Sequence, residues 1–345
     1  MKNILLALLS CMSVAVMGSC NEDETNITNE QLVEINAIPV SAKIIFHKDN
    51  IIYTMDENGE NMTQITYDDN FTLEHVALSY DRTKIVCNYF SDLSVGSQSS
   101  KMILYDIIKK TRTHLVPQFA MSGNGGVDWD KNDNIYFAGV DELLFLNPRT
   151  IAAYKANAGA NDIYKMKYDG TGLQNLTNTT EYGEADVSLS PDDQTISYMA
   201  TNIADPENSF TEIWKRDVDG TKPVLLFVGG QNKVSSVHDP EISPDGNFVI
   251  FSRVNNEVDP VFPNNPLANT AHDIIKLNLN TSELKVLTDP GPISIAPDWA
   301  YDKILFLDIS DKTNPPHAGI ATINTDGTGY NLIQNGTNIG KWIPE

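Results

Sequence analysis

A short stretch that recurs along the whole chain constrains its fold more than any other feature. The clearest copy spans residues 240–252 and places Ser243-Pro244-Asp245-Gly246 between two apolar runs. Proline presets φ, aspartate bonds to nearby backbone, and glycine accepts a conformation that most residues avoid, so this tetrapeptide is typical of a tight turn. The residues that follow it, 248–251, are β-branched and aromatic, which favours a buried strand. The stretch therefore predicts a β-hairpin.

Imperfect copies of this hairpin recur, each with a turn followed by an apolar strand. They lie at residues 78–86, 129–137, 189–198 and 299–306. A second apolar strand, often followed by Asn-Gly or Asp-Gly, alternates with the hairpin. Its copies begin at Ile52, Met102, Ile163, Ile213, Ile274 and Ile320. Repeats of roughly 45–60 residues with four short strands each are typical of a β-propeller, in which each blade buries its faces against its neighbours.

The two ends of the chain share one repeat. Residues 342–345 align with the turn of the recurring stretch, and the strand that should follow this turn is found at residues 43–46. A ring closed by strands from both termini leaves no terminal blade unpaired. The sequence therefore predicts an all-β fold over residues 41–345. We expect a six-bladed β-propeller of four-stranded antiparallel blades, with the C-terminal strand joining the N-terminal blade.

Residues 1–20 have the features of an export signal. A basic start precedes an apolar run, residues 4–16, that is too short for a permanent membrane span. The run ends in Met17-Gly18-Ser19-Cys20, which resembles the lipobox of bacterial lipoproteins, although methionine stands where leucine or valine is more usual. The resemblance implies lipidation of Cys20, and we expect an outer membrane lipoprotein that faces the periplasm or the cell surface. An ordinary cleaved signal with an incidental cysteine is the alternative.

Residues 21–40 are polar and poor in aromatic side chains, which predicts a flexible tether. Its first four residues, Asn21-Glu22-Asp23-Glu24, resemble the acidic surface-export signals of lipoproteins from Bacteroidota, and a solvated acidic linker is the alternative. Cys87 is alone in a predicted strand, because Cys11 leaves with the signal and Cys20 carries lipid. We therefore expect no intramolecular disulfide and interpret Cys87 as a core residue.

The formal charge of −22, from 24 basic and 46 acidic residues, bears on the choice of partner. Nucleic acids and anionic lipid surfaces are bound by clustered Lys and Arg, so we expect neither as a partner and expect membrane contact only through the lipid anchor. The sequence contains no phosphate-binding Gly-x-x-x-x-Gly-Lys, Gly-x-Ser-x-Gly or His-Glu-x-x-His motif. We accordingly name no catalytic residue.

The repeats resemble a known family. Residues 242–246, together with Asp169-Gly170-Thr171-Gly172 and Leu176-Thr177, resemble the WD40-like repeat of TolB-type propellers. The resemblance covers nearly all of the chain after the signal and implies the propeller fold. Similar propellers occur in Tol-system proteins, in peptidase accessory domains and in some carbohydrate-active lyases, so the resemblance leaves the function open.

Candidate binding residues come from the geometry of a propeller blade. The inner strands should begin on the face that also carries the long insertions, residues 89–101, 139–162, 201–212, 253–273 and 308–319. Loops of this length on a rigid ring are often functional. Polar residues expected on this face are Glu74, His75, Glu184, Asp186, His238, Asp239, His272 and His317. They could form a divalent metal or acid/base site at the pore mouth, or be rim residues satisfied by water and backbone.

Two classes of function remain. The first is a non-catalytic binding or scaffold lipoprotein without a cofactor, which holds an envelope protein or a glycan. The second is a metal-assisted lyase or hydrolase that uses histidines at the pore mouth. Trp129, Trp299 and Trp342 share one repeat position, so we interpret them as wedges between blades rather than as a sugar-stacking platform. The first class is favoured, because an acid, a base and a positioned electrophile cannot all be named.

Overall fold

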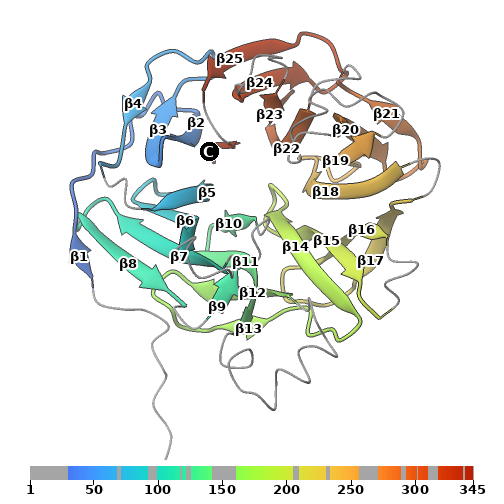
Figure 1. The fold of residues 1–345 in the computed structure, drawn as a ribbon, viewed down its shortest axis with the longest axis horizontal. Helices are drawn as coiled ribbons and strands as arrows, with labels where there is room; N and C mark the ends of the chain where they lie inside the picture. The colour runs from blue at the N-terminus through green and yellow to red at the C-terminus, as the bar shows by residue number, and fades with distance from the viewer. Residues whose placement is uncertain are drawn as a thin grey trace, which may run out of the picture.

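The computed structural model describes residues 30–67, 71–91, 99–116, 119–121, 126–141, 161–204, 210–230, 234–255, 271–288, 293–300, 302–309, 318–336 and 339–344. Within these ranges it contains 26 strands and no helix, and thus no helix that could cross a membrane. The strands form a ring of sheets around a central axis, and the C-terminal end lies close to that axis (Figure 1). The predicted all-β propeller fold is confirmed.

Consecutive strands pair antiparallel in runs of four. The first run contains β26 (Gly340–Trp342), β2 (Ile44–Lys48), β3 (Ile51–Met55) and β4 (Thr63–Gln64). The second contains β5 (Thr72–Leu78), β6 (Lys84–Ser91), β7 (Ser99–Asp106) and β8 (Thr111–Leu115). The third contains β10 (Val127–Trp129), β11 (Asn134–Asp141), β12 (Asp162–Lys167) and β13 (Gln174–Asn175).

The remaining runs follow the same order from the axis outwards. The fourth contains β14 (Tyr182–Leu189), β15 (Thr195–Asn202), β16 (Thr211–Asp217) and β17 (Val224–Val228). The fifth contains β18 (Val234–Ile242), β19 (Phe248–Asn255), β20 (Ala271–Asn278) and β21 (Leu284–Val286). The sixth contains β22 (Ile293–Ala300), β23 (Lys303–Ile309), β24 (Gly319–Asn324) and β25 (Asn331–Asn335).

The number of sheets differs from the six expected from the sequence. Hydrogen bonds join the described strands into four sheets, of ten, four, eight and four strands. The short strand β9 (Phe119–Met121) pairs with both β7 and β11 and so links the second and third runs. A parallel bridge between His272 and Ile293 links the fifth and sixth. The difference therefore arises from pairing between neighbouring runs, which the repeat pattern does not encode.

The ring closes as the sequence predicts. Trp342 pairs with Ile44 and Gly340 with Phe46, so β26 from the C-terminus is the inner strand of the run that begins at the N-terminus. The backbone N–H of Ile343 extends the contact by donating to the carbonyl oxygen of Lys43 at 2.7 Å. Both termini are therefore needed to complete this sheet.

The serine–aspartate turns after the inner strands explain the recurring stretch. In three of them the serine Oγ donates to the aspartate Oδ1 two residues later, in the pairs Ser79 with Asp81 (2.6 Å), Ser190 with Asp192 (2.7 Å) and Ser243 with Asp245 (2.6 Å). The same serine Oγ accepts from the backbone N–H five residues ahead, at 2.9 to 3.0 Å. Turn chemistry therefore accounts for these residues.

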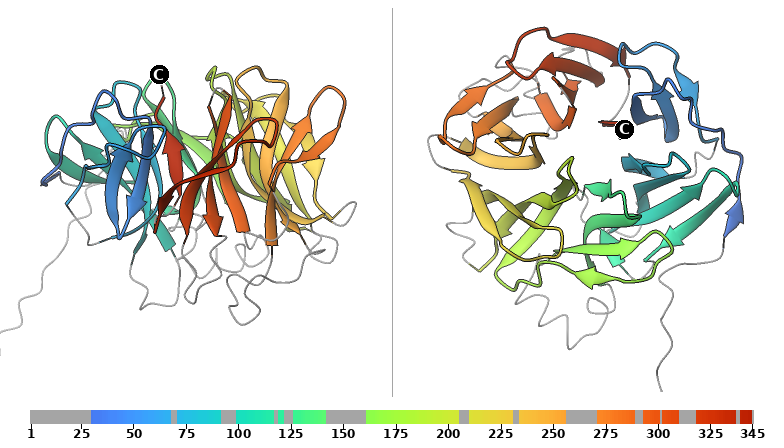
Figure 2. Two further views of the ribbon diagram at one scale, coloured as in Figure 1. Left: turned by 90° about the horizontal axis from the view of Figure 1, so that it is seen from above. Right: turned by 180° about the vertical axis from the view of Figure 1, so that it is seen from behind.

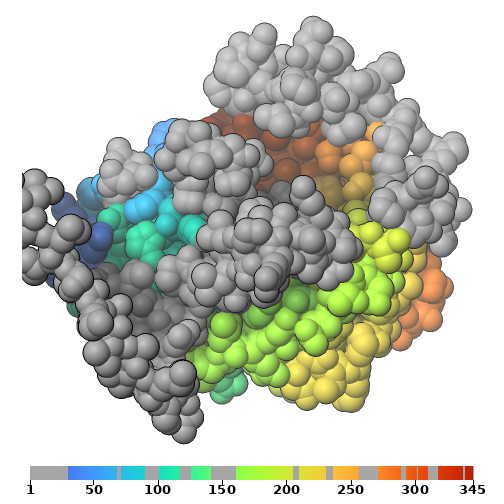
Figure 3. Space-filling view, turned by 60° about the horizontal axis from the view of Figure 1, so that its bottom comes forward, coloured from blue at the N-terminus to red at the C-terminus, as the bar shows by residue number. Residues whose placement is uncertain are grey.

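The hydrophobic core is divided among the gaps between neighbouring runs. One cluster joins Ile85 and Ile103 of the second run to Ile45 of the first. Another joins Leu305 of the sixth run to Phe46 of the first, across the point of closure. Cys87 is fully buried in this core, as predicted. The space-filling view shows segments of successive colours side by side, green next to yellow and yellow next to orange (Figure 3). Each run thus buries its faces against its neighbours.

The second half of the predicted tether differs from expectation. β1 (Gln31–Leu32) pairs antiparallel with the outer strand β8. Ile35 is fully buried, and the backbone N–H of Asn36 donates to the carbonyl oxygen of Ile65 at 2.8 Å. Because Ile35 gains apolar contacts and β1 covers a strand edge, residues 31–36 belong to the propeller.

Candidate functional site

The six inner strands, β5, β10, β14, β18, β22 and β26, run between two faces of the ring. The strands begin at the entry face, at residues such as Tyr182, and end at the turn face, where the Ser243 turn lies. In the side view the C-terminal end emerges at one face of the ring (Figure 2). Asn202, at the start of the predicted insertion 201–212, pairs with Tyr182, so this insertion leaves the ring at the entry face. The predicted insertions themselves lie largely outside the described residues.

A bulge recurs in the inner strands. The register shifts between Ala185 and Ser188, between His238 and Glu241, and at matching places in β5 and β22. The bulge residues Asp186, Asp239 and Ala296 have φ values of 52°, 52° and 51°. Bulges often re-aim side chains near functional sites. Here they occur at matching positions in four of the six inner strands, β5, β14, β18 and β22.

Two layers of residues surround the axis. The bulge layer lines a pocket of about 50 Å³ and comprises His75, Gly126, Asp186, Asp239, Ala296 and Ile339. Two residues further along the chain in four of these six repeats, toward the turn face, lies the charged layer: Asp128, Glu241, Asp298 and Lys341. The charged layer lines a second pocket of about 250 Å³, and three of its members, Glu241, Asp298 and Lys341, line both pockets. It therefore separates the two pockets.

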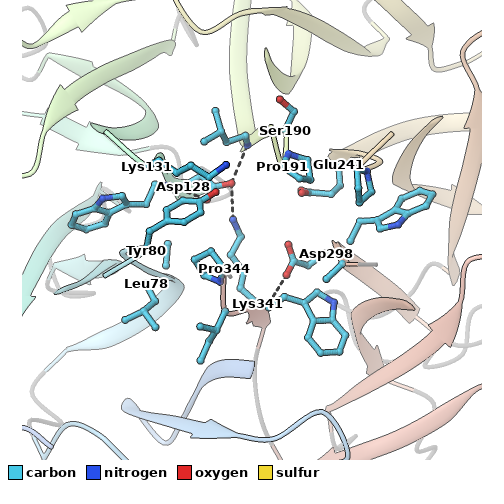
Figure 4. A pocket seen from close by; sticks show the side chains of 18 residues that line it. Leu78, Tyr80, Asp128, Lys131, Ser190, Pro191, Glu241, Asp298, Lys341 and Pro344 are labelled. Atoms are coloured by element: carbon cyan, nitrogen blue, oxygen red, sulfur yellow. Dashed lines mark hydrogen bonds and ion pairs between the residues drawn. The ribbon is translucent and has the colours of Figure 1, made fainter. Parts of the chain in front are cut away.

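In the charged layer one lysine faces three carboxyl groups. Lys341 Nζ lies 3.0 Å from Asp128 Oδ2, and its side chain extends across the pocket toward Asp128 (Figure 4). Asp298 Oδ2 accepts from the backbone N–H of Trp342 at 2.5 Å, and Glu241 accepts from the hydroxyl of Ser188. The carboxyl groups outside the ion pair are thus held by neutral donors.

Burial shifts the pKa values of this layer. It raises the pKa of Glu241 well above its usual value, with a further contribution from nearby Asp298. Burial also raises the pKa of Asp298, to about 6, although Lys341 opposes the shift. Burial alone would lower the pKa of Lys341, but Asp128, Asp298 and Glu241 outweigh it and raise that pKa. Lys341 is therefore held as a cation, while Glu241 favours its neutral form.

In the bulge layer Asp239 is the central acceptor. Its Oδ2 lies 2.8 Å from His238 Nδ1 and accepts from the backbone N–H of Ala296 and from the hydroxyl of Ser252, each at 3.0 Å. Burial opposes ionisation, but His238 and these donors lower the pKa of Asp239 to about 2. Asp186 differs, because its buried Oδ1 has no hydrogen-bond partner among the described residues.

The titration of the other bulge-layer groups follows their burial. Burial raises the pKa of Asp186 well above its usual value, and the neighbouring Asp239 adds to the effect. Burial also lowers the pKa of His75 to about 4, although Asp239 opposes the shift. Burial thus favours the neutral form of both groups, next to an ionised Asp239.

The structure brings together part of the predicted set. His75, Asp186 and Asp239 line the smaller pocket, and His238 contacts Asp239. The ring of His272 packs edge-on against that of His238, with 5.3 Å between centroids. Within the described residues no group of three or more His, Cys, Asp or Glu has a metal-holding arrangement.

The rest of the predicted set lies elsewhere. Glu184 is buried beside Thr179, whose hydroxyl donates to Glu184 Oε1 at 2.7 Å, and burial raises the pKa of Glu184 to about 8. Glu74 lies at the β5 bulge, where its carbonyl oxygen is 2.8 Å from His47 Nε2. His317 and Cys20 lie outside the described residues.

Sequence reasoning missed the pocket at the turn face. Its walls are apolar and aromatic, with Leu78, Tyr80, Trp129, Pro191, Trp299 and Pro344 among the lining residues. The repeats contained a signal for this layer. The residue just before the recurring tryptophan is charged: Asp128, Asp298 and Lys341. In the repeat that has Ile242 in place of the tryptophan, the residue before it is Glu241. Aligning that column would have shown charged residues in four of the six repeats, with Ala77 and Ser188 in the other two.

Two of the three tryptophans predicted to be wedges, Trp129 and Trp299, are packed in the core, whereas Trp342 is partly buried. Trp129 stacks on Tyr168 with 6.2 Å between ring centroids, and Trp299 stacks on Phe248 at 6.4 Å. Both indoles are buried, with 2% and 7% of their surface exposed. A ring face covered by another aromatic side chain is not available to stack on a sugar.

Comparison with known proteins supports the fold. No protein-family model matches the sequence, and no curated protein matches it. The solved structure of TolB from Acinetobacter baumannii aligns with a TM-score of 0.61 and 15% identity, over 88% of this chain and 67% of that chain. A chain of a nidogen/laminin complex aligns with a TM-score of 0.58 and 11% identity, over 87% of this chain and 98% of that chain. At such identities these structures show the TolB-like β-propeller fold alone.

Proposed function

We propose that this chain is a non-catalytic binding propeller of the bacterial cell envelope, anchored in the outer membrane by a lipid on Cys20, and that its partner is an envelope protein. One observation carries the proposal. The charged groups at the axis are held by each other and by neutral donors, while the pocket in front of them has apolar and aromatic walls. A preformed concave pocket of this composition favours binding.

The choice of a protein over a glycan rests on the tryptophans. Glycan sites commonly use an exposed ring face, whereas Trp129 and Trp299 are stacked on Tyr168 and Phe248. A binding propeller is also compatible with the TolB-like fold.

We further propose to count the ring as six blades. Six inner strands surround the axis, and each hydrophobic cluster of the described core lies between two neighbouring runs. The strand β9 and the His272–Ile293 bridge then join neighbouring blades without adding to their number.

Site-specific photo-crosslinking tests the proposed function. A photoreactive residue replaces Lys131, which lines the pocket, and in a matched control it replaces Ile108, which is exposed at the outer edge. The proposal predicts an envelope protein that crosslinks from position 131 but not from 108 and then binds the purified chain directly. If no protein crosslinks and the purified chain instead binds to a glycan array, the partner is a glycan and not a protein. Equal crosslinking from both positions would overturn the proposed site.

A further inference from the structure

The pocket at the turn face combines a floor of carboxyl groups with walls that suit an aliphatic stem. Its floor is the charged layer, in which Glu241 and Asp298 lie beside the Lys341–Asp128 pair (Figure 4). Leu78, Leu189 and Pro191 contribute to the walls. The volume of about 250 Å³ is smaller than the ~300–1,000 Å³ typical of drug-sized ligand sites. It therefore suits one long side chain.

The floor has more carboxyl groups than cations. Lys341 is the cation of the layer, and it lies 3.0 Å from Asp128. Among the described residues neither Glu241 nor Asp298 forms an ion pair within 4.0 Å; their bonding partners are the Ser188 hydroxyl and the Trp342 N–H. Lys341 is thus the one described cation that the three carboxyl groups of the charged layer share. Burial raises the pKa of both Glu241 and Asp298, and a cation that entered the pocket would favour their ionised forms.

The lysine at the rim does not supply this cation. Lys131 Nζ lies 3.4 Å from Asp193 Oδ2 and 5.3 Å from the centre of the Tyr80 ring. It is therefore engaged at the mouth of the pocket rather than at the floor. The same arrangement shows that an aromatic ring of this pocket accepts a cation at its face.

From these features we propose that the turn-face pocket binds an arginine or lysine side chain of the partner protein, with its cationic group at Glu241 and Asp298 and its stem between the apolar walls. This inference rests on the proposed function and specifies the chemistry of its partner. A guanidinium or ammonium group gains charge-assisted hydrogen bonds at the floor. An anionic side chain at the same position would be repelled by the excess of carboxylates.

The test uses Nα-acetyl-arginine amide as the probe and Nα-acetyl-citrulline amide as its neutral counterpart. Binding is followed by tryptophan fluorescence, because three of the four tryptophans line the pocket, and by calorimetry. We expect the arginine probe to bind about tenfold or more tightly than the citrulline probe, as the loss of a charged hydrogen bond implies. Equal binding of the two probes, or binding of neither at millimolar concentration, would overturn the inference.

Variants locate the site. The double variant Glu241→Gln and Asp298→Asn should lose the preference for arginine, whereas Asp245→Asn, an exposed turn variant on the same face, should keep it. Should the double variant not fold, Asp298→Asn alone is compared in the same assay, and an unchanged preference there contradicts the inference.

The crosslinked partner separates the two proposals: if it binds the double variant as tightly as the wild type, the cation site is wrong and the binding function stands. If the arginine probe binds but no partner is found by crosslinking, the cation site stands and the binding function is wrong.

Discussion

Lys341 of β26 and Asp128 of β10 form an ion pair of 3.0 Å across the propeller axis. The pair ties the closing strand β26 to β10 of the third run, and its side chains are 21% and 18% exposed. Removing one partner of a largely buried pair leaves an uncompensated charge and costs about 3 kcal/mol or more. An ion pair therefore stabilises the closed ring together with the apolar contacts.

We predict that Lys341→Met lowers the free energy of unfolding by about 3 kcal/mol, because Asp128, Asp298 and Glu241 would then be buried without their shared cation. Urea denaturation followed by tryptophan fluorescence measures the change. The double variant Lys341→Met and Asp128→Asn should recover part of the loss, since it removes one of the uncompensated charges. Strictly additive effects would show that the pair contributes no coupling.

The second prediction concerns the C-terminus. Deleting residues 340–345 removes β26 and leaves the inner edge of β2 unpaired, with loss of the buried Ile343. Removing large apolar side chains typically costs about 3–5 kcal/mol, a large part of the ~5–15 kcal/mol that stabilises a domain. Scanning calorimetry should show a sharply lower melting temperature, while deletion of residue 345 alone should have little effect. An unchanged melting curve would argue against closure by β26.

A third prediction uses the pKa of Glu184, which burial raises to about 8. A carboxyl group with a raised folded-state pKa contributes its full stability below its unfolded pKa, about 4.5, and loses it as the pH rises through about 8. Each pKa unit is worth about 1.4 kcal/mol. Glu184→Gln should therefore gain stability relative to the wild type between pH 4.5 and 8. The exposed Glu181→Gln serves as the control, and parallel melting profiles for wild type and Glu184→Gln would refute the assignment.

How much of this could be read from the sequence depends on the range of the interactions. The Ser243–Asp245 turn is local, and its residues determine its geometry, so the hairpins and the closing repeat were predictable. The charged layer was not, because it depends on strands from distant repeats meeting at one level of the axis. Nor did the polarity of residues 31–36 predict that Ile35 is buried, since a single isoleucine carries little signal in a polar segment.

The fourth prediction concerns the anchor. The wild-type precursor should be lipidated and should partition with membranes, whereas Cys20→Ser should not be lipidated and should be released, because several acyl chains together hold a protein firmly. Fractionation and mass spectrometry of the mature amino terminus provide the measurement. A mature terminus at any residue other than Cys20 contradicts the anchor.

Protease treatment of intact cells then tests whether Asn21-Glu22-Asp23-Glu24 directs the protein to the surface, and replacing these four residues with serine and glycine is the matched control.

The last prediction contrasts two aspartates at equivalent bulges. Asp239 accepts from His238, Ala296 and Ser252, so Asp239→Asn should cost about 2 kcal/mol through weaker charged hydrogen bonds. Asp186 has a buried oxygen without a partner and a raised pKa, so Asp186→Asn should change stability by less than about 0.5 kcal/mol or increase it at neutral pH.

The pH dependence of the two variants should also differ in sign. The pKa of Asp239 is lowered to about 2, so its contribution to the free energy of unfolding is present above pH 3.8 and is lost as the pH falls through about 2. Asp239→Asn should therefore cost less stability in acid. The pKa of Asp186 is raised, so its contribution is present below pH 3.8 and is lost as the pH rises. Urea melts from pH 2 to 8 measure both. If the two variants lose equal stability at pH 7, then burial and hydrogen bonding do not assign opposite charge states to these residues.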